Sequence, residues 1–169
     1  TSGNDSDGIQ AYVSGAGGNI TIGAYNGGVG GNDVTTTGDD SEGIIAKVAE
    51  TGDVDIDADV VKTTGLESGG VYAFTKNGMV DITTGSVTTT GLGTGKALSS
   101  SFGIFGMAYS TGDVTIHTGP VSTAADYAFG IGAITGLGNI DITGSTVTTT
   151  GLLGADLGDI PYTSFGVGG

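Results

Sequence analysis

The sequence contains no cysteine, tryptophan or arginine, and four lysines stand against 18 acidic residues. The absence of cysteine excludes disulfides, thiolate metal sites and cysteine nucleophiles. The formal net charge of −14 argues against nucleic acid or an anionic membrane as a partner, because both are bound by basic surfaces. No apolar run is long enough to span a membrane.

Glycine, in contrast, makes up 36 of the 169 residues, and so much glycine beside a strong charge bias is typical of disordered chains. We nevertheless expect a folded protein, because 37% of the residues are hydrophobic and because valine and isoleucine recur with strict regularity. Such recurrence is the signature of a repeat architecture.

Each repeat consists of three short blocks in a fixed order. One block has the form Ser-x-Gly-Ile/Val-x-small, as in residues 41–46, and the next is a pair of β-branched residues two positions apart, as in Val54 and Ile56. The third block reads VTTTG and occurs at 34–38, 87–91 and 147–151. Equivalent isoleucines of the second block lie 34 or 26 residues apart, at Ile22, Ile56, Ile82, Ile116 and Ile142. The basic unit is therefore 26 residues long, and we expect loop insertions at 23–33, 92–100 and 152–163.

The blocks alternate apolar with polar residues and are bounded by Gly, Asn or Asp, which predicts short strands and little or no helix. Three such strands cannot bury an apolar face unless successive units stack. The sequence thus predicts one all-β segment over residues 1–169, a right-handed parallel β-helix (β-solenoid) of about 26 residues per turn and five to six turns.

Positions that are nearly constant between units are assigned to the interior. The first block supplies one interior column of Ile or Val, formed by Ile9, Ile44, Val71, Ile104 and Ile131. The second block supplies the paired residues from Ile20/Ile22 to Ile140/Ile142. The third block supplies a valine column, formed by Val34, Val61, Val87, Val121 and Val147. Two residues after each valine comes a threonine, which predicts an interior ladder of hydroxyls bonded to backbone carbonyls or to the next threonine: Thr36, Thr63, Thr89, Thr123 and Thr149.

The outward positions of the first block are unexpectedly apolar. We predict an interface there, formed by Tyr12, Ile45, Tyr72, Phe74, Phe105, Met107 and Ile134. Contiguous exposed apolar surface usually marks an interaction site. Three interpretations stay open: the insertions cover this face, another chain or domain docks on it, or its rings form a platform for sugars.

The outward positions of the second block are mostly acidic, at Asp53, Asp55, Asp57, Asp59, Asp81, Asp113 and Asp141. Carboxylates stacked one strand apart repel, and a hard cation such as Ca²⁺ would relieve the repulsion. We therefore consider a Ca²⁺ site formed by Asp53, Asp55, Asp57, Asp81, Asp113 and Asp141; the alternative is a solvated acidic face that keeps the chain soluble. Residues 27–34 also resemble a single calcium-binding nonapeptide, although such motifs work in tandem and a glycine loop is favoured.

Two further activities, catalysis and ice binding, are alternatives to an ordinary solvent-exposed surface. His117 is the sole histidine, and no nucleophile-elbow sequence accompanies it, so we predict no enzymatic activity. Outward threonine pairs such as Thr35/Thr37, Thr88/Thr90 and Thr148/Thr150 resemble the arrays of ice-binding solenoids, but Lys62 and Ala124 interrupt the array.

The three blocks together resemble the repeats in passenger domains of bacterial autotransporters and in haemagglutinin-like adhesins. The resemblance covers nearly the whole chain and concerns the repeat type. It implies a right-handed parallel β-helix exported by a Gram-negative bacterium to the cell surface or beyond, with an adhesive or stalk-like role.

The resulting hypothesis is a non-enzymatic structural or adhesive component of an extracellular filament or cell-surface fibre. Neither end of the repeat shows a polar cap, so we expect a part of a longer fibre or a subunit that stacks end to end. The expected partners are copies of the chain itself, neighbouring repeats, or surface glycans. An ice- or carbohydrate-binding module is the alternative, and a polysaccharide-active enzyme is the least favoured.

Overall fold

The computed structural model describes residues 1–23, 32–91, 101–124, 128–150 and 167–168. Over these residues the chain forms 14 strands and no helix. The strands are β1 (Ile9–Val13), β2 (Ile20–Ile22), β3 (Val34–Thr36), β4 (Ile44–Thr51), β5 (Val54–Thr63), β6 (Val71–Asn77), β7 (Val80–Thr89), β8 (Phe102–Thr111), β9 (Val114–Thr118), β10 (Val121–Thr123), β11 (Phe129–Thr135), β12 (Ile140–Gly144), β13 (Val147–Thr149) and β14 (Val167–Gly168). Across the described ranges there is accordingly no helix that could cross a membrane.

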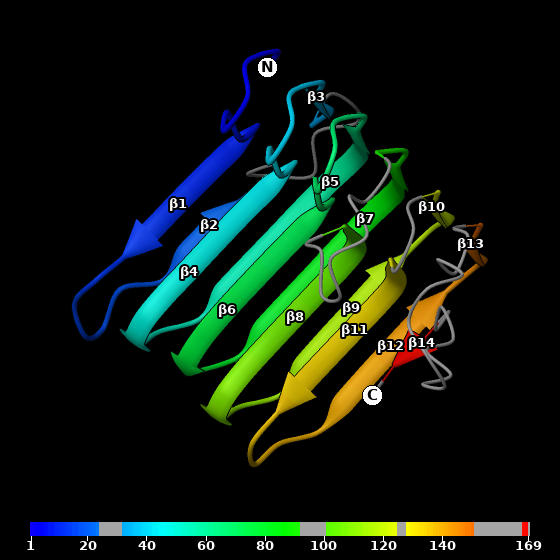
Figure 1. The fold of residues 1–169 in the computed structure, drawn as a ribbon. Coiled ribbons are helices and arrows are strands. Elements are labelled where there is room, and N and C mark those ends of the chain that lie inside the picture. Colours follow the sequence, from blue (N-terminus) through cyan, green and yellow to red (C-terminus); the bar gives the residue numbers. More distant parts are fainter. Residues whose placement is uncertain (24–31, 92–100, 125–127, 151–166, 169) are drawn as a thin grey trace, which may run out of the picture.

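The strands form two sheets, called sheet A and sheet B. Within each sheet the strands are parallel and are stacked along one common axis (Figure 1). Sheet A has the order β1-β4-β6-β8-β11-β14, and sheet B has β5 and β7 at its centre, flanked by β2 and β3 on one side and by β9, β10, β12 and β13 on the other. We call the strands at one height a rung: rung 1 is β1–β3, rung 2 is β4–β5, rung 3 is β6–β7, rung 4 is β8–β10 and rung 5 is β11–β13. This all-β arrangement of parallel sheets is consistent with a β-solenoid.

The repeat blocks occupy identical places in successive rungs. Ile44 pairs with Val71, Val54 with Val80, and Val61 with Val87. Parallel pairing in register stacks equal side chains above one another, so each repeated sequence position becomes a column along the axis. The columns predicted for the interior, for the apolar outer positions and for the outer aspartates are all present.

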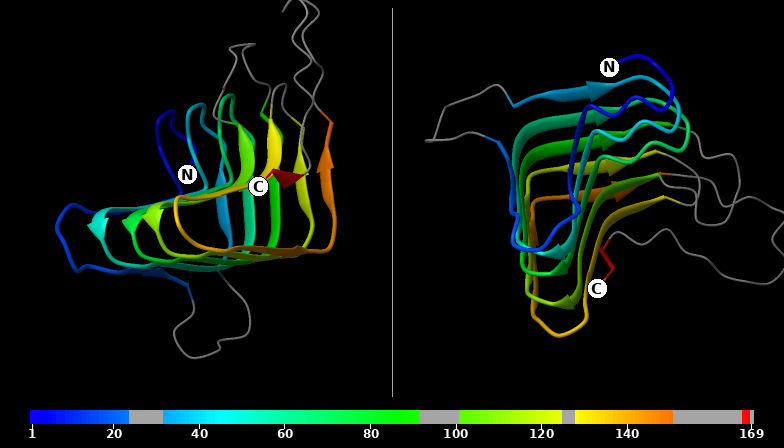
Figure 2. Two further views of the ribbon diagram at one scale, coloured as in Figure 1. Left: turned by 90° about the horizontal axis from the view of Figure 1, so that it is seen from below. Right: turned by 90° about the vertical axis from the view of Figure 1, so that its left-hand side faces the viewer.

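The second and third blocks are joined in rungs 2 and 3, where the sequence predicts separate strands. β5 and β7 each run through both blocks as one 10-residue strand. The alternation of β5 shifts by one position at Asp59, after which Val60 is exposed and Val61 is buried. β5 continues through this shift as one strand. Each rung is L-shaped in cross-section, with sheet A on its inner, concave side (Figure 2).

The interior consists of the predicted aliphatic columns. Ile44, Ile56, Val61, Ile82 and Ile104 are fully buried. The threonine ladder is buried as well, but it is bonded only in part: Thr36 and Thr63 donate to the carbonyl oxygens of Ser41 and Ser68 at 3.0 and 3.4 Å. Within the described residues, the hydroxyls of Thr89 and Thr123 have no hydrogen-bond partner.

Glycine is frequent because the rungs approach one another closely at their corners. A Cβ at Gly43 would lie 2.6 Å from the carbonyl oxygen of Gly70, which is closer than carbon and oxygen tolerate. An added Cβ would clash in the same way with the carbonyl of a glycine one rung away at repeated positions in three columns. The glycines concerned include Gly70 and Gly103 in the first column, Gly65 and Gly91 in the second, and Gly78 and Gly112 in the third. The abundance of glycine thus reflects packing between rungs.

Two of the expected insertions, at 92–100 and 152–163, lie outside the described residues. Most residues of the insertion expected at 23–33 and of the nonapeptide-like segment at 27–34 also lie outside them. Of the last partial repeat, the structure describes β14, which pairs with Ile131 and Gly132 of β11.

Candidate functional site

The apolar outer positions of sheet A form two neighbouring columns, as predicted. One contains Ile45, Tyr72 and Phe105, and the other contains Tyr12, Phe74, Met107 and Ile134 with Lys47 between Tyr12 and Phe74. Tyr12 and Ile134 are exposed, at 64% and 48%, and Lys47 is exposed as well, whereas the other side chains of the two columns are half-buried.

The rings on this face pack against each other. Tyr72 stacks on Phe105 with 5.8 Å between ring centroids, and Phe102 stacks on Phe129 at 5.7 Å. The two stacks touch edge-on, and the Lys47 ammonium lies 5.0 Å from the Tyr72 ring centroid. We call Tyr72, Phe102, Phe105 and Phe129 the aromatic cluster. At least one face of each ring is used inside the cluster, which weakens the interpretation of this surface as a flat sugar platform.

Phe102 and Phe129 were not among the residues predicted for this face. Both stand in a column where earlier rungs have Glu42 and Gly69, and the Phe102 ring covers Gly69. A Cβ on Gly69 would lie 2.4 Å from Cζ of that ring, which is too close for two carbon atoms. The recurrence of phenylalanine at the same repeat position in rungs 4 and 5 was the signal in the sequence.

The predicted calcium ligands do not converge on one point. Asp55 and Asp81 are register neighbours, but Thr115 separates Asp81 from Asp141, and Asp57 lies in a different column, next to Thr83. Among the described residues, no three Asp, Glu or His side chains gather closely enough to hold a metal ion. A Ca²⁺ site therefore stays a prediction of the sequence.

Asp53 and Asp113 have a structural role at the corner between the sheets. Asp53 Oδ1 accepts a hydrogen bond from the Met79 backbone N–H at 2.9 Å, and Asp113 Oδ1 accepts one from the Asn139 N–H at 2.7 Å. In rung 1 Asn19 Oδ1 does the same for Asp53 N–H at 2.9 Å. Each of these side chains caps the next rung, and the signal was an Asn or Asp just before the paired β-branched residues.

Stacking raises the pKa of some carboxyl groups. The pKa of Asp55 is raised by partial desolvation and then by the charges of Asp81 and Asp57. The strongest effect is at Glu42, where burial and a hydrogen bond with Asp7 of the previous rung raise the pKa to about 7. Asp7 also accepts from Glu42 N–H and from Gln10 Nε2, both at 3.0 Å.

The outward threonines of the third block and His117 lie on the exposed surface of sheet B. Thr35, Thr88 and Thr148 share one column, and Lys62 and Ser122 interrupt it. His117 is exposed and its Nδ1 forms a hydrogen bond with the Thr143 hydroxyl.

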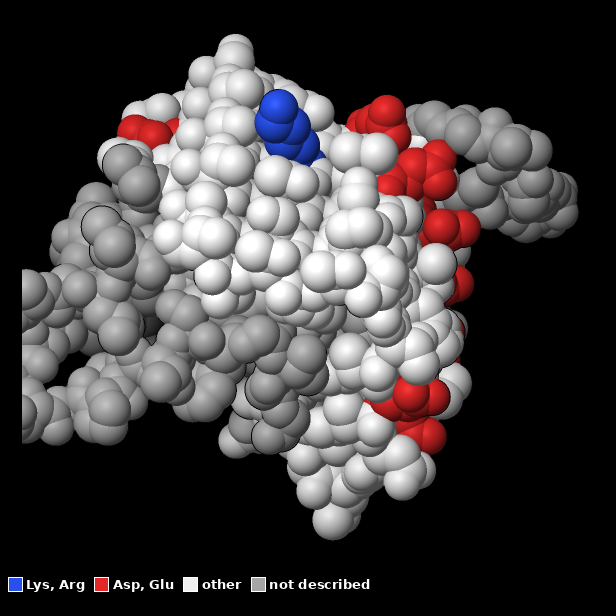
Figure 3. Space-filling model, turned by 90° about the vertical axis from the view of Figure 1, so that its right-hand side faces the viewer, with Lys and Arg blue, Asp and Glu red and all other residues white. Residues whose placement is uncertain are grey.

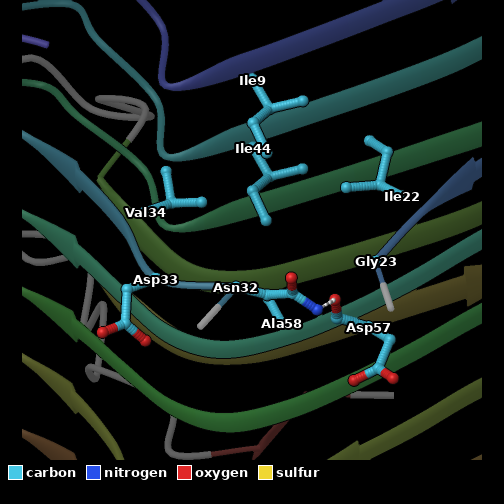
Figure 4. A pocket seen from close by; sticks show the side chains of 9 residues that line it. All are labelled: Ile9, Ile22, Gly23, Asn32, Asp33, Val34, Ile44, Asp57 and Ala58. Atoms are coloured by element: carbon cyan, nitrogen blue, oxygen red, sulfur yellow. Dashed lines mark hydrogen bonds between the residues drawn. The ribbon is translucent and has the colours of Figure 1, made fainter. Parts of the chain in front are cut away.

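A cavity of about 230 Å³ opens into the core at rung 1 (Figure 4). Its apolar wall comes from Ile9, Ile22, Val34, Ile44 and Ala58. Where β5 is one continuous strand in rung 2, the described residues of rung 1 form the separate strands β2 and β3. Asn32 Nδ2 donates a hydrogen bond of 3.4 Å to the Asp57 carbonyl oxygen.

The two terminal rungs leave interior-type side chains accessible. In the column that contains Ile140, the side chains of rungs 2 to 4 (Val54, Val80 and Val114) are at most 1% exposed, whereas Ile140 itself is 39% exposed. Ile142 and Val147 are partly exposed, as are Ile9, Val13 and Ile22 of rung 1.

Carboxylates line one edge of the view in Figure 3, and most of the remaining described surface there is uncharged.

The sheet B edge of rung 5 is the candidate functional site, because among the described residues no strand pairs beyond β12 and β13 there, and Ile140 and Ile142 are accessible. Comparison with family models, with curated proteins and with solved structures finds no match to this chain.

Proposed function

We propose that this chain is a right-handed β-solenoid of five to six turns, about 26 residues each, that serves as a non-enzymatic structural or adhesive component of an extracellular filament or surface fibre of a Gram-negative bacterium. The handedness follows the general preference of parallel crossovers. The turn length is supported by the registers Val54–Val80 and Val114–Ile140.

The observation that carries the proposal is the exposure of core positions at the terminal rungs, of which Ile140 at 39% is the clearest. A bare solenoid end presents a row of unpaired backbone groups beside apolar side chains, and this combination favours association with another edge. Two different ends that meet head to tail give an open assembly that grows along one axis, because such an interface does not close on itself.

Electron microscopy and sedimentation velocity of the 169-residue chain test the proposal. We expect unbranched filaments whose mass rises with protein concentration. Ile140→Lys places a charge on the exposed end of rung 5 and should stop growth. Met79→Lys is the matched control, because Met79 is 54% exposed on the side of the solenoid. A wild-type chain that stays monomeric at high concentration would contradict the proposal.

A further inference from the structure

Asn77 and Gly78 form an Asn-Gly pair at the corner where β6 ends and the chain turns into β7. The equivalent pairs in the neighbouring rungs are Thr51-Gly52 and Thr111-Gly112, so the stack does not require asparagine before the glycine. Asn77 is half-buried. An asparagine that precedes glycine loses its side-chain amide most readily, because glycine has no side chain to hinder attack by its own backbone nitrogen.

The stack does require glycine at position 78. The φ angle of Gly78 is +150°, a conformation that favours glycine, and an added Cβ would lie 2.2 Å from the carbonyl oxygen of Gly52 in rung 2. Packing therefore excludes the side chain that would protect Asn77. The corner combines a fixed glycine with an asparagine for which neighbouring rungs use threonine.

Two backbone hydrogen bonds hold the pair in place. The Gly78 N–H donates to the Thr111 carbonyl oxygen of rung 4 at 3.1 Å, and the Gly52 N–H of rung 2 donates to the Asn77 carbonyl oxygen at 2.9 Å. Attack on the side chain needs a Gly78 nitrogen that has lost its proton and can move towards Cγ of Asn77. While rungs 3 and 4 stay paired, this proton is held by a hydrogen bond and the nitrogen is fixed in the ladder.

We propose that Asn77 is a site of spontaneous deamidation, controlled by opening of the corner between rungs 3 and 4. The Gly78 nitrogen bonds to Cγ of Asn77, the Cγ–Nδ2 bond breaks, and the amide nitrogen leaves as ammonia with the proton from Gly78. Water then opens the resulting succinimide ring at one of its two carbonyl carbons. Opening at Cγ gives aspartate, and opening at the main-chain carbonyl carbon gives isoaspartate.

The product weakens the corner in which it forms. Both products add a negative charge to a chain whose formal net charge is already −14. Isoaspartate also lengthens the main chain by a carbon atom just before Gly78. The N–H groups of Gly78 and Met79 would then no longer match their acceptors in the neighbouring rungs, Thr111 O at 3.1 Å and Asp53 Oδ1 at 2.9 Å. Conversion thus runs from a closed corner to a less stable one.

Peptide mapping by mass spectrometry at mildly alkaline pH measures the conversion. Asn26→Gln serves as the background, since it removes the other Asn-Gly pair of the sequence. We expect the chain unfolded in urea to convert Asn77 at least about tenfold faster than the folded chain, because the folded chain reacts through its open form. Equal rates would show that the fold does not control the reaction, and no conversion in the unfolded chain would remove the site.

Two glycine variants distinguish opening of this corner from general loosening. Gly112→Ala places a Cβ 1.8 Å from the Gly78 carbonyl oxygen, and Gly65→Ala places one at the same distance from the Gly38 carbonyl oxygen, at another corner. In the folded chain we expect Gly112→Ala to speed conversion of Asn77 by about tenfold or more, and Gly65→Ala by less than about twofold, because rungs open locally. Equal acceleration by the two variants would overturn control by this corner.

Hydrogen exchange supplies a second measurement, which does not depend on whether Gly112→Ala folds. In the chain that carries Asn26→Gln alone, the Gly78 N–H exchanges when its hydrogen bond to Thr111 opens. We expect its exchange rate and the conversion rate of Asn77 to rise together as urea is added below the unfolding transition. Conversion that rises while the Gly78 N–H stays protected would refute the proposal.

Discussion

Glu42 couples the stability of the first two rungs to pH. Its pKa is raised from 4.5 to about 7 by burial and by the hydrogen bond with Asp7, and Lys47 offsets this only in part. The folded chain therefore holds a proton that the unfolded chain has released between about pH 4.5 and about pH 7. Over this range the contribution of Glu42 to stability falls as the pH rises, and it is largest below about pH 4.5.

The magnitude follows from the size of the pKa difference. A fully buried group with this difference would contribute about 3 kcal/mol, at about 1.4 kcal/mol for each pH unit. The Glu42 side chain keeps partial contact with solvent, so screening reduces the expected change to roughly 1–2 kcal/mol.

The assay is urea unfolding of wild type and Glu42→Gln at several pH values across this range. We expect the glutamine variant to lose this part of the pH dependence and to be the more stable chain near neutral pH. Glu50→Gln, which removes a surface carboxylate paired with Lys76 at 2.8 Å, matches the change in net charge. If Glu42→Gln and Glu50→Gln had the same effect at every pH, the assignment to the Glu42–Asp7 pair would be wrong.

Three further predictions concern the stacking itself and use the free energy of unfolding as the measurement. Gly43→Ala should lose roughly 1–3 kcal/mol because its Cβ would collide with a backbone carbonyl, whereas Gly15→Ala, where space is open, should stay close to wild type. Ile82→Ala should lose roughly 2–5 kcal/mol, and Met79→Ala less than about 0.5 kcal/mol, since the first side chain is fully buried and the second is exposed. Phe105→Ala should lose roughly 1–3 kcal/mol through its ring contacts, and a loss as small as that of Met79→Ala would show that the aromatic cluster does not stabilise the fold.

The architecture was predictable because stacking demands the same residue at the same place in every rung. Val61 and Val87 are nearly identical in surroundings, and the repeat of such positions reveals the columns directly. The joining of two blocks into β5 was not predictable from the repeat, because the strand continues although the alternation of buried and exposed residues shifts by one position at Asp59. The roles of Asp53 and Phe102 were missed for a related reason, since each is decided by a neighbour one rung away.

The ends were only partly predictable. The repeat predicts Ile140 as an interior residue, and its 39% exposure comes from its place in the outermost described strand of sheet B. The cavity beside Ile9 and Val34 was not predictable, because its lining brings together residues of rungs 1 and 2 that the repeat does not relate to one another. Repetition in a sequence reports what the rungs share, and it says little about a place where one rung differs.

The direction of the hydrogen bonds has a mechanical consequence. In both sheets the hydrogen bonds between strands run along the stacking axis. A force along this axis therefore acts on all the hydrogen bonds between two rungs at once, such as those along the nine register pairs between β5 and β7. A pull on the chain end would instead peel one strand at a time. A detached rung of the shorter kind, from Val54 to Val80 for example, would release 26 residues, which is roughly 90 Å of extended chain in place of a spacing of ~4.8 Å. Such a molecule resists tension along its axis and lengthens by unwinding before any covalent bond is strained.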